Sequence, residues 1–112
     1  MAQKTLAFTA SAQTFATVPE HKKMKPRSIN IIDVAAGAKV LTFTDVFTTD
    51  ASAGASAATV TNTWLKVYCP GSGVNIEKTK SALEGIELLG AVKVTSDVAD
   101  ATSYVTLAYD LE

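Results

Sequence analysis

The sequence is poor in the side chains that carry reaction chemistry: it has one cysteine, one histidine and one arginine. Cys69 alone cannot form a disulfide within the chain, which excludes a secreted scaffold held together by disulfides. A zinc site needs three or four thiolate or imidazole ligands, and Cys69 with His21 cannot supply them. We therefore expect neither a metal site nor a bound cofactor.

Long apolar runs and a strong charge of one sign are also missing. No apolar window approaches about 20 residues, so we expect no transmembrane helix. The first ten residues, MAQKTLAFTA, hold one lysine and no apolar run of signal length, so we expect no signal peptide and synthesis in the cytoplasm. The net charge of −1 gives no general reason to bind nucleic acid or an anionic membrane.

The most reactive side chains lack the neighbours that catalysis requires. His21 lies in PEHKKMKPR, where Glu20 is the one nearby carboxylate that could orient it as a base. Cys69 ends an apolar stretch just before a turn, a position typical of a packing residue. Asp97 and Asp100 lack the spacing of a calcium loop. The sequence therefore predicts a protein that is not an enzyme.

What is present favours β-structure. Threonine and valine, which suit a pleated surface, are frequent, and charged residues make up only 19% of the chain. Five stretches alternate with the period of two that is typical of strands: KTLAFTA, RSINIID, KVLTFTDVF, ATVTNTWLKVYC and TSYVTLAYDLE. The prediction is a mainly β, single-domain antiparallel sandwich or small barrel over residues 1–112, with an N-terminal arm over 1–27.

The same alternation predicts which side chains face inward. In ATVTNTWLKVYC it places Trp64 and Leu65 on opposite faces of one strand. Large apolar side chains at the predicted strand positions are expected to supply most of the core: Leu41, Phe43, Phe47, Trp64, Leu65, Val67, Leu107 and Tyr109.

Local signals predict how the strands are connected. CPGSG has the Pro-Gly pair of a type II turn, and DVAAGAK predicts a hairpin between two apolar runs. At most one short helix is expected, near 79–86, because Ser81 and Glu84 have the spacing of a capping box. The alternative is that GIELLGAVKV is a strand with a bulge at Gly90.

Residues 48–58 contain no side chain larger than aspartate or threonine. We predict a flexible loop there, although Asp50 could also cap a short helix. Small side chains let backbones approach closely and lose little rotamer entropy when a neighbour orders them. The loop therefore supplies one half of a candidate interface: Asp50, Ala51, Ser52, Ala53, Gly54 and Ala55.

A dense basic cluster supplies the other half of the candidate interface: His21, Lys22, Lys23, Lys25 and Arg27. The cluster could dock on an acidic protein neighbour, or it could be a solvated connection between Pro19 and Pro26. Nucleic acid is disfavoured as the partner because no aromatic residue is interleaved for stacking and only one arginine is present.

The chain resembles small structural proteins of tailed bacteriophage virions, especially capsid decoration (cement) proteins. The resemblance rests on a composition rich in Ala, Thr and Val, and on the segment MAQKTLAFTASAQTF followed by polar linkers. It implies a non-enzymatic protein of the virion that stabilises the shell by packing between coat subunits. Its implied partners are the major capsid protein, or another virion protein, and copies of itself, as a homotrimer.

Two other classes of function remain open. The first is a different phage structural role, in head–tail joining or in the tail. The second is a carbohydrate- or surface-binding β-module, which would expose several of its aromatic side chains together on one face: Trp64, Tyr68, Tyr104 and Tyr109.

Overall fold

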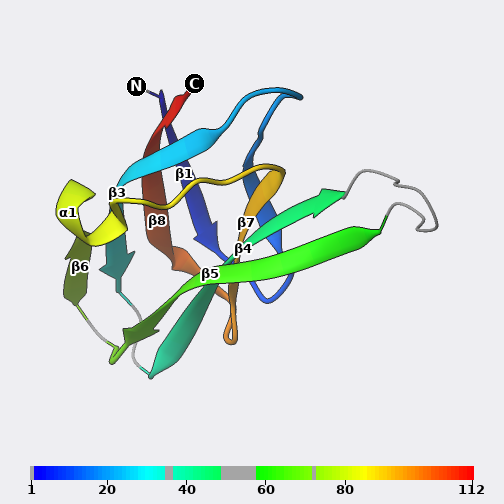
Figure 1. Cartoon of the computed structure of the whole chain (residues 1–112). Helices are drawn as coiled ribbons and strands as arrows, with labels where there is room; N and C mark the ends of the chain where they lie inside the picture. The colour runs from blue at the N-terminus through cyan, green and yellow to red at the C-terminus, as the bar shows by residue number, and fades with distance from the viewer. Residues whose placement is uncertain (1, 35–36, 49–57, 72) are drawn as a thin grey trace.

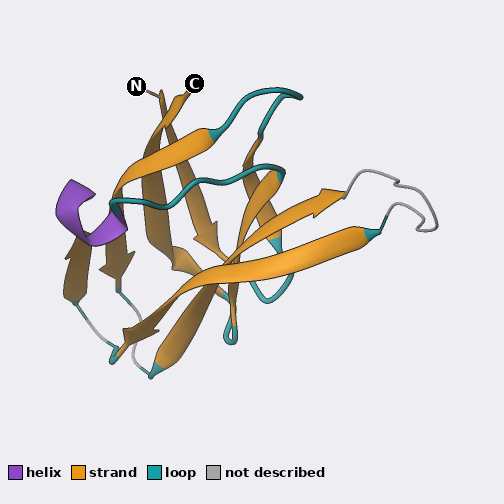
Figure 2. Ribbon diagram, viewed as in Figure 1, coloured by secondary structure: helices purple, strands orange, loops and turns teal. Residues whose placement is uncertain are grey.

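The computed structural model describes residues 2–34, 37–48, 58–71 and 73–112 (Figure 1). These residues form strands and one short helix: β1 (Ala2–Phe8), β2 (Gln13–Thr17), β3 (Met24–Asp33), β4 (Lys39–Thr48), β5 (Thr59–Cys69), β6 (Val74–Lys78), α1 (Lys80–Leu83), β7 (Ala91–Ser96) and β8 (Asp100–Leu111). Figure 2 shows how far strands outweigh helix in this fold. The predicted mainly β class is confirmed.

The strands form two antiparallel sheets of four strands each, packed as a sandwich. Sheet A has the order β1-β8-β3-β6, and sheet B has the order β2-β7-β4-β5. Figure 1 shows β5 of sheet B toward the viewer and the darker β1 and β8 of sheet A further back. The antiparallel sandwich that the alternation predicted is therefore the observed architecture.

The chain moves from one sheet to the other at almost every connection. Among the described strands, β4 and β5 are the consecutive pair that lies in a single sheet, where they form a long hairpin. The hairpin predicted at DVAAGAK is wrong, because β3 belongs to sheet A and β4 to sheet B. A Gly-containing connection with polar ends suits a crossing between sheets as well as it suits a tight turn, so the local signal could not separate the two.

The N-terminal segment is part of the sandwich, which corrects the arm predicted over 1–27. Strand β1 pairs with β8, and β2 pairs with β7. The side chains of Phe8, Phe15 and Met24 are buried in the core. Their apolar surface stabilises the fold when it is removed from water, so this segment is held against the body of the protein.

The core lies between the two sheets and contains most of the predicted residues. Leu41, Phe43, Val67, Leu107 and Tyr109 are buried. The half-buried side chains of Trp64 and Leu65 pack against this core, and Phe47 is also half-buried. The core therefore extends further toward the N-terminal strands than the sequence suggested.

A β-bulge explains why Trp64 and Leu65 both reach the core. In the pairing of β4 with β5, Phe43 lies opposite Leu65 while Thr44 lies opposite Thr63. Trp64 is thus the extra residue, and a bulge of this kind breaks the alternation of faces. The Trp64 ring rests against Phe43 with the ring centroids 5.4 Å apart. The prediction that Trp64 and Leu65 take opposite faces assumed an uninterrupted strand.

The single described helix, α1, falls within the predicted range 79–86. Its N-cap is Thr79, which makes no side-chain capping bond, so the capping box predicted from Ser81 and Glu84 is wrong. The next strand, β7, begins at Ala91, and Leu88 makes an isolated bridge to Met24 before it. No helix in the described part of the chain is long and apolar enough to cross a membrane.

Candidate interaction surface

The predicted basic cluster lies along a seam where residues 19–27 face residues 84–89. The seam is closed at its middle by the bridge between Met24 and Leu88, whose N–H groups each donate to the carbonyl oxygen of the other residue at 2.9 Å. Both side chains are buried. A pocket opens on each side of this bridge, and the two pockets divide the basic cluster between them.

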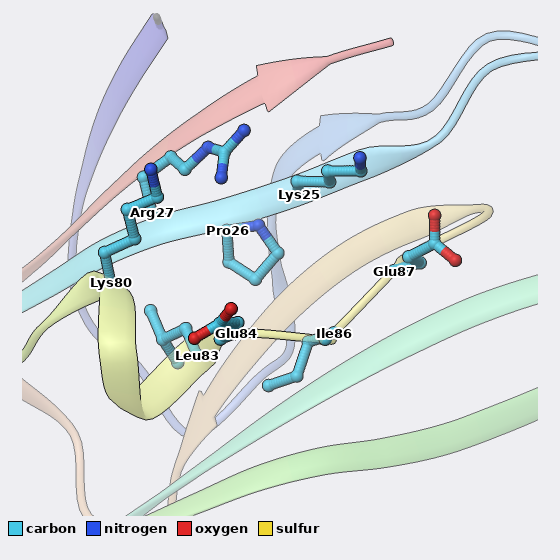
Figure 3. Close-up of a pocket in the computed structure, with 9 residues that line it drawn as sticks. Lys25, Pro26, Arg27, Lys80, Leu83, Glu84, Ile86 and Glu87 are labelled. Atoms are coloured by element: carbon cyan, nitrogen blue, oxygen red, sulfur yellow. The ribbon is translucent and has the colours of Figure 1, made fainter.

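The first pocket has a volume of about 400 Å³ and is shown in Figure 3. Strand β3 lines it with Lys25, Pro26 and Arg27, and α1 lines it with Lys80 and Leu83. The connection that follows α1 closes the remaining side. Figure 3 shows the Lys25 and Arg27 side chains directed away from Ile86, and the Glu84 carboxylate beside Leu83. Charged and apolar groups therefore line the pocket together.

Two of the three cations that line the first pocket, Lys25 and Arg27, are already paired with carboxylates from the C-terminal end. Arg27 donates from Nε to Asp110 Oδ2 at 2.6 Å, and Lys25 Nζ lies 2.7 Å from Glu112 Oε2. The hydrogen bond from Lys25 lowers the pKa of Glu112, and the hydrogen bond from Arg27 lowers that of Asp110. Lys23 Nζ lies 3.4 Å from Glu87. These contacts reduce the positive field that the sequence assigned to the cluster.

The second pocket has a volume of about 390 Å³ and lies beside the C-terminal end of β4. His21, Lys22 and Lys23 line one side of it, and Phe47 and Thr48 from the end of β4 line another. The first half of the basic cluster and the first residue of the predicted loop 48–58 therefore meet at one end of the molecule.

The loop at this pocket presents its polar residues to solvent. The His21 side chain is 90% exposed, with Nε2 3.8 Å from Glu20 Oε1, and its backbone has a φ of 65°. A non-glycine residue in this left-handed region is uncommon and lies in a tight turn here. Lys22 is exposed and makes no ion pair with the described residues. The loop therefore offers one unpaired cation beside the apolar groups Phe47 and Leu89.

The small-residue half of the candidate interface lies outside the described residues: Asp50, Ala51, Ser52, Ala53, Gly54 and Ala55. Of the range 48–58, the structure describes Thr48 and Ala58, and both are exposed. These two residues place the ends of the segment at the tips of β4 and β5. The prediction of a loop, rather than a helix, stays a prediction.

The side chains considered for metal binding or nucleophilic chemistry lie apart in the described structure. Within the described ranges, no three His, Cys, Asp or Glu residues lie close enough to hold a metal ion. Cys69 is buried, and this burial raises the pKa of its thiol, which keeps the sulfur in its less nucleophilic protonated form. His21 and Cys69 lie in different parts of the fold, at the 18–23 loop and at the end of β5.

The structure also contains a buried ionic cluster that we did not predict. Lys39 Nζ lies 2.8 Å from Asp33 Oδ1 and 3.8 Å from Asp100 Oδ2, and the side chains of Lys39 and Asp33 are 2% and 0% exposed. The hydrogen bond to Asp33 raises the pKa of Lys39. Ser103 donates to Asp100, and bonds from Ser103 and Thr102 lower the pKa of Asp100 to about 2. The cluster joins the two sheets at one end of the sandwich, because Asp33 and Asp100 belong to sheet A and Lys39 belongs to sheet B.

A signal for this cluster was present in the sequence. Asp33 continues the inward positions of Ile29 and Ile31, and Lys39 precedes Leu41 by the same step of two. Charged residues on the buried phase of adjacent strands need partners, because an unpaired buried charge is very costly. Asp33 and Lys39 carry opposite charges, occupy inward positions and lie at the two ends of the connection between β3 and β4. These features together could have predicted the ion pair.

No family model, no curated protein and no solved structure matches the chain.

Proposed function

We propose that the chain is a non-enzymatic structural protein of a phage virion that acts by contact, as a capsid decoration protein packing between coat subunits. The observation that carries the proposal is that the basic loop lies beside the end of β4, the strand that precedes the small-residue segment in the sequence. His21, Lys22 and Lys23 line the same pocket as Phe47 and Thr48, from which the small-residue segment continues.

This end of the molecule has the chemistry of a contact surface. It combines half-exposed apolar groups, Phe47 and Leu89, with the unpaired cation of Lys22. Apolar groups ringed by polar ones are typical of the surfaces that proteins use to bind one another. The small side chains that follow Thr48 in the sequence would let a backbone approach a partner closely at little entropic cost.

The experiment uses shells assembled from the coat protein encoded nearest to this gene. The protein should sediment with expanded shells and raise the temperature at which they dissociate. Phe47→Ala and Lys22→Glu should each weaken this co-sedimentation, whereas Lys4→Glu on the far strand β1 should leave it unchanged. Loss of shell binding in the Lys4 variant alone, or no shell binding by the unmodified protein, contradicts the proposal.

A role in head–tail joining or in the tail is the second structural candidate, and the same variants test it. Binding to isolated connectors or tails, with no binding to shells, would favour it. The carbohydrate-binding alternative has less support, because its four aromatic residues do not share a face. Tyr109 is buried and Trp64 packs against Phe43, while Tyr68 and Tyr104 are exposed on different sheets.

A further inference from the structure

Strand β5 presents a long free edge at the side of sheet B. It has eleven residues and pairs with β4 along its whole length, and no described strand lies on its other side. Figure 1 shows β5 running across the front of the molecule as the outer strand of its sheet. Roughly half of the backbone N–H and C=O groups of an edge strand point away from its one neighbour, ready to pair with another strand.

The first half of β5 lacks the features that keep edge strands apart. Residues 59–63, TVTNT, contain no charge and no proline, and they pair in regular register with Thr44–Thr48. The bulge at Trp64 and the exposed Lys66 come only after this half. Charges, prolines, bulges and short length are the means by which edges avoid pairing.

The other three edges of the sandwich are protected. Strand β1 carries Lys4, and β6 is five residues long and carries Glu77 and Lys78. Strand β2 is also five residues long, and a bulge between Thr14 and Ala16 interrupts it. The first half of β5 is thus the edge best suited to accept a strand.

We propose that β5 pairs antiparallel with β5 of a second copy of this chain, about a two-fold axis near Thr61. The proposal names a second copy as a partner in the contact role proposed above, in place of the homotrimer that the resemblance implies, and it rests on that role. Backbone hydrogen bonds between Thr59–Thr63 of the two copies would join the two B sheets into one continuous sheet of eight strands. This is strand addition, in which main-chain bonds supply the affinity.

A second copy is the occupant whose properties the edge already matches. A two-fold axis makes the two strands antiparallel and equal in length, and it is the commonest symmetry of protein pairs. With the axis at Thr61, Thr59 lies opposite Thr63 of the second copy, and no like charges face one another across the contact. Head-to-tail pairing of β5 with β2 would instead meet a short strand with a bulge.

The test is a charge swap at the axis, read by size-exclusion chromatography with light scattering. The unmodified protein should have the mass of two chains. Thr61→Lys and Thr61→Glu should each have the mass of one chain, since each places like charges face to face at the axis. Mixing the two variants should restore the mass of two chains. Thr14→Lys on β2 is the matched control and should leave the mass of two chains unchanged.

The outcomes separate this pairing from the alternatives. A single-chain mass for the unmodified protein, or a pair that survives in Thr61→Lys, overturns it. Dissociation by Thr14→Lys, which is expected for head-to-tail rings, also overturns the pairing. A measured mass of three chains overturns it as well. If the mixed variants do not reassociate, a symmetric contact at Thr61 is excluded. Shell binding is measured separately, so a single-chain protein that still binds shells contradicts the pairing and leaves the virion role standing.

Discussion

Asp33 and Lys39 form an ion pair that is buried between the ends of the two sheets. Replacing Asp33 with alanine removes the carboxylate at 2.8 Å from the buried Lys39 ammonium and leaves that of Asp100 at 3.8 Å. Breaking a buried pair by removing one partner typically costs about 3–5 kcal/mol, and we expect that loss in the free energy of unfolding. Urea unfolding at neutral pH measures it. The exposed carboxylate of Glu77 provides the control, and Glu77→Ala should change stability by less than about 0.5 kcal/mol. An equal effect of the two substitutions would show that the pair does not stabilise the fold.

Trp64 is a half-buried side chain whose ring packs against Phe43. Replacing it with alanine removes this contact but leaves the rest of the core in place, so we expect a loss of about 3 kcal/mol. Phe43 is fully buried, and Phe43→Ala should cost more, up to about 5 kcal/mol. Thermal melting of the two variants tests the order. A melting temperature unchanged by Trp64→Ala would make Trp64 a surface group and would revive the carbohydrate-binding alternative.

Single residues also show where reading the alternation succeeded and where it failed. The period of two correctly placed Leu41, Phe43 and Leu107 inward. Asp33 and Asp45 also fall on inward positions of this pattern and are buried. They are absent from the predicted core because that prediction considers apolar residues alone. The alternation predicts whether a side chain points inward. It does not predict which residue of another strand will pair with a buried charge.

At the scale of elements, the turn before β7 is held by a carboxylate from β4. Asp45 accepts the N–H of Gly90 at 2.8 Å and the N–H of Leu89 at 2.9 Å. A Cβ atom at Gly90 would lie 2.0 Å from the carbonyl oxygen of Val46, which is backbone and cannot rotate away. This turn therefore depends on glycine for close approach of the chain.

Gly90→Ala should therefore destabilise the fold by about 3 kcal/mol, at the upper end of the cost of overpacking. The control is Gly85→Ala, where the added Cβ meets nothing within 4 Å and only the positive φ of 86° opposes it. That strain amounts to about 1–2 kcal/mol. Chemical denaturation of both variants measures the difference. If Gly90→Ala costs no more than Gly85→Ala, the close approach to Val46 is not a constraint on the fold.

The elements themselves could be predicted where the alternation is long. The alternation predicts the stretches that form β1, β3, β4, β5 and β8, whereas it does not predict β2 and β6, which have five residues each. Alternation over five residues arises easily by chance, and the bulge in β2 breaks it further. The order of strands within each sheet depends on pairing between distant segments, for which a single sequence carries no local signal.

At the scale of the whole molecule, the same pairing decides the charge of the candidate surface. The basic cluster could be read directly from PEHKKMKPR, but its neutralisation could not, because Asp110 and Glu112 follow it by more than 80 residues. They reach it because β3 lies antiparallel to β8, with Lys25 opposite Asp110. Which cations of the basic cluster are neutralised therefore depends on how the strands pair, and the sequence alone does not show it.

This distribution of charge predicts how stability depends on pH. Hydrogen bonds from Ser103 and Thr102 lower the pKa of Asp100 from 3.8 to about 2. A carboxyl with a lower pKa in the folded state binds protons more weakly there than in the unfolded chain. It therefore stabilises the fold above pH 3.8, and this contribution is lost as the pH falls toward about 2. The pKa values of Asp110 and Glu112 are also lowered, so they act in the same direction.

We therefore expect the free energy of unfolding to fall as the pH decreases from 4 to 2, across the range set by Asp100. Asp100→Asn should be less stable than the unmodified protein at pH 6, because it loses the charge near Lys39, yet it should lose less stability on acidification. Urea unfolding at a series of pH values measures both effects. Arg27→Gln provides an independent comparison, because it removes the interaction that lowers the pKa of Asp110 and should also reduce the acid-induced loss. Parallel curves for the unmodified protein and Asp100→Asn would show that Asp100 does not contribute to this dependence.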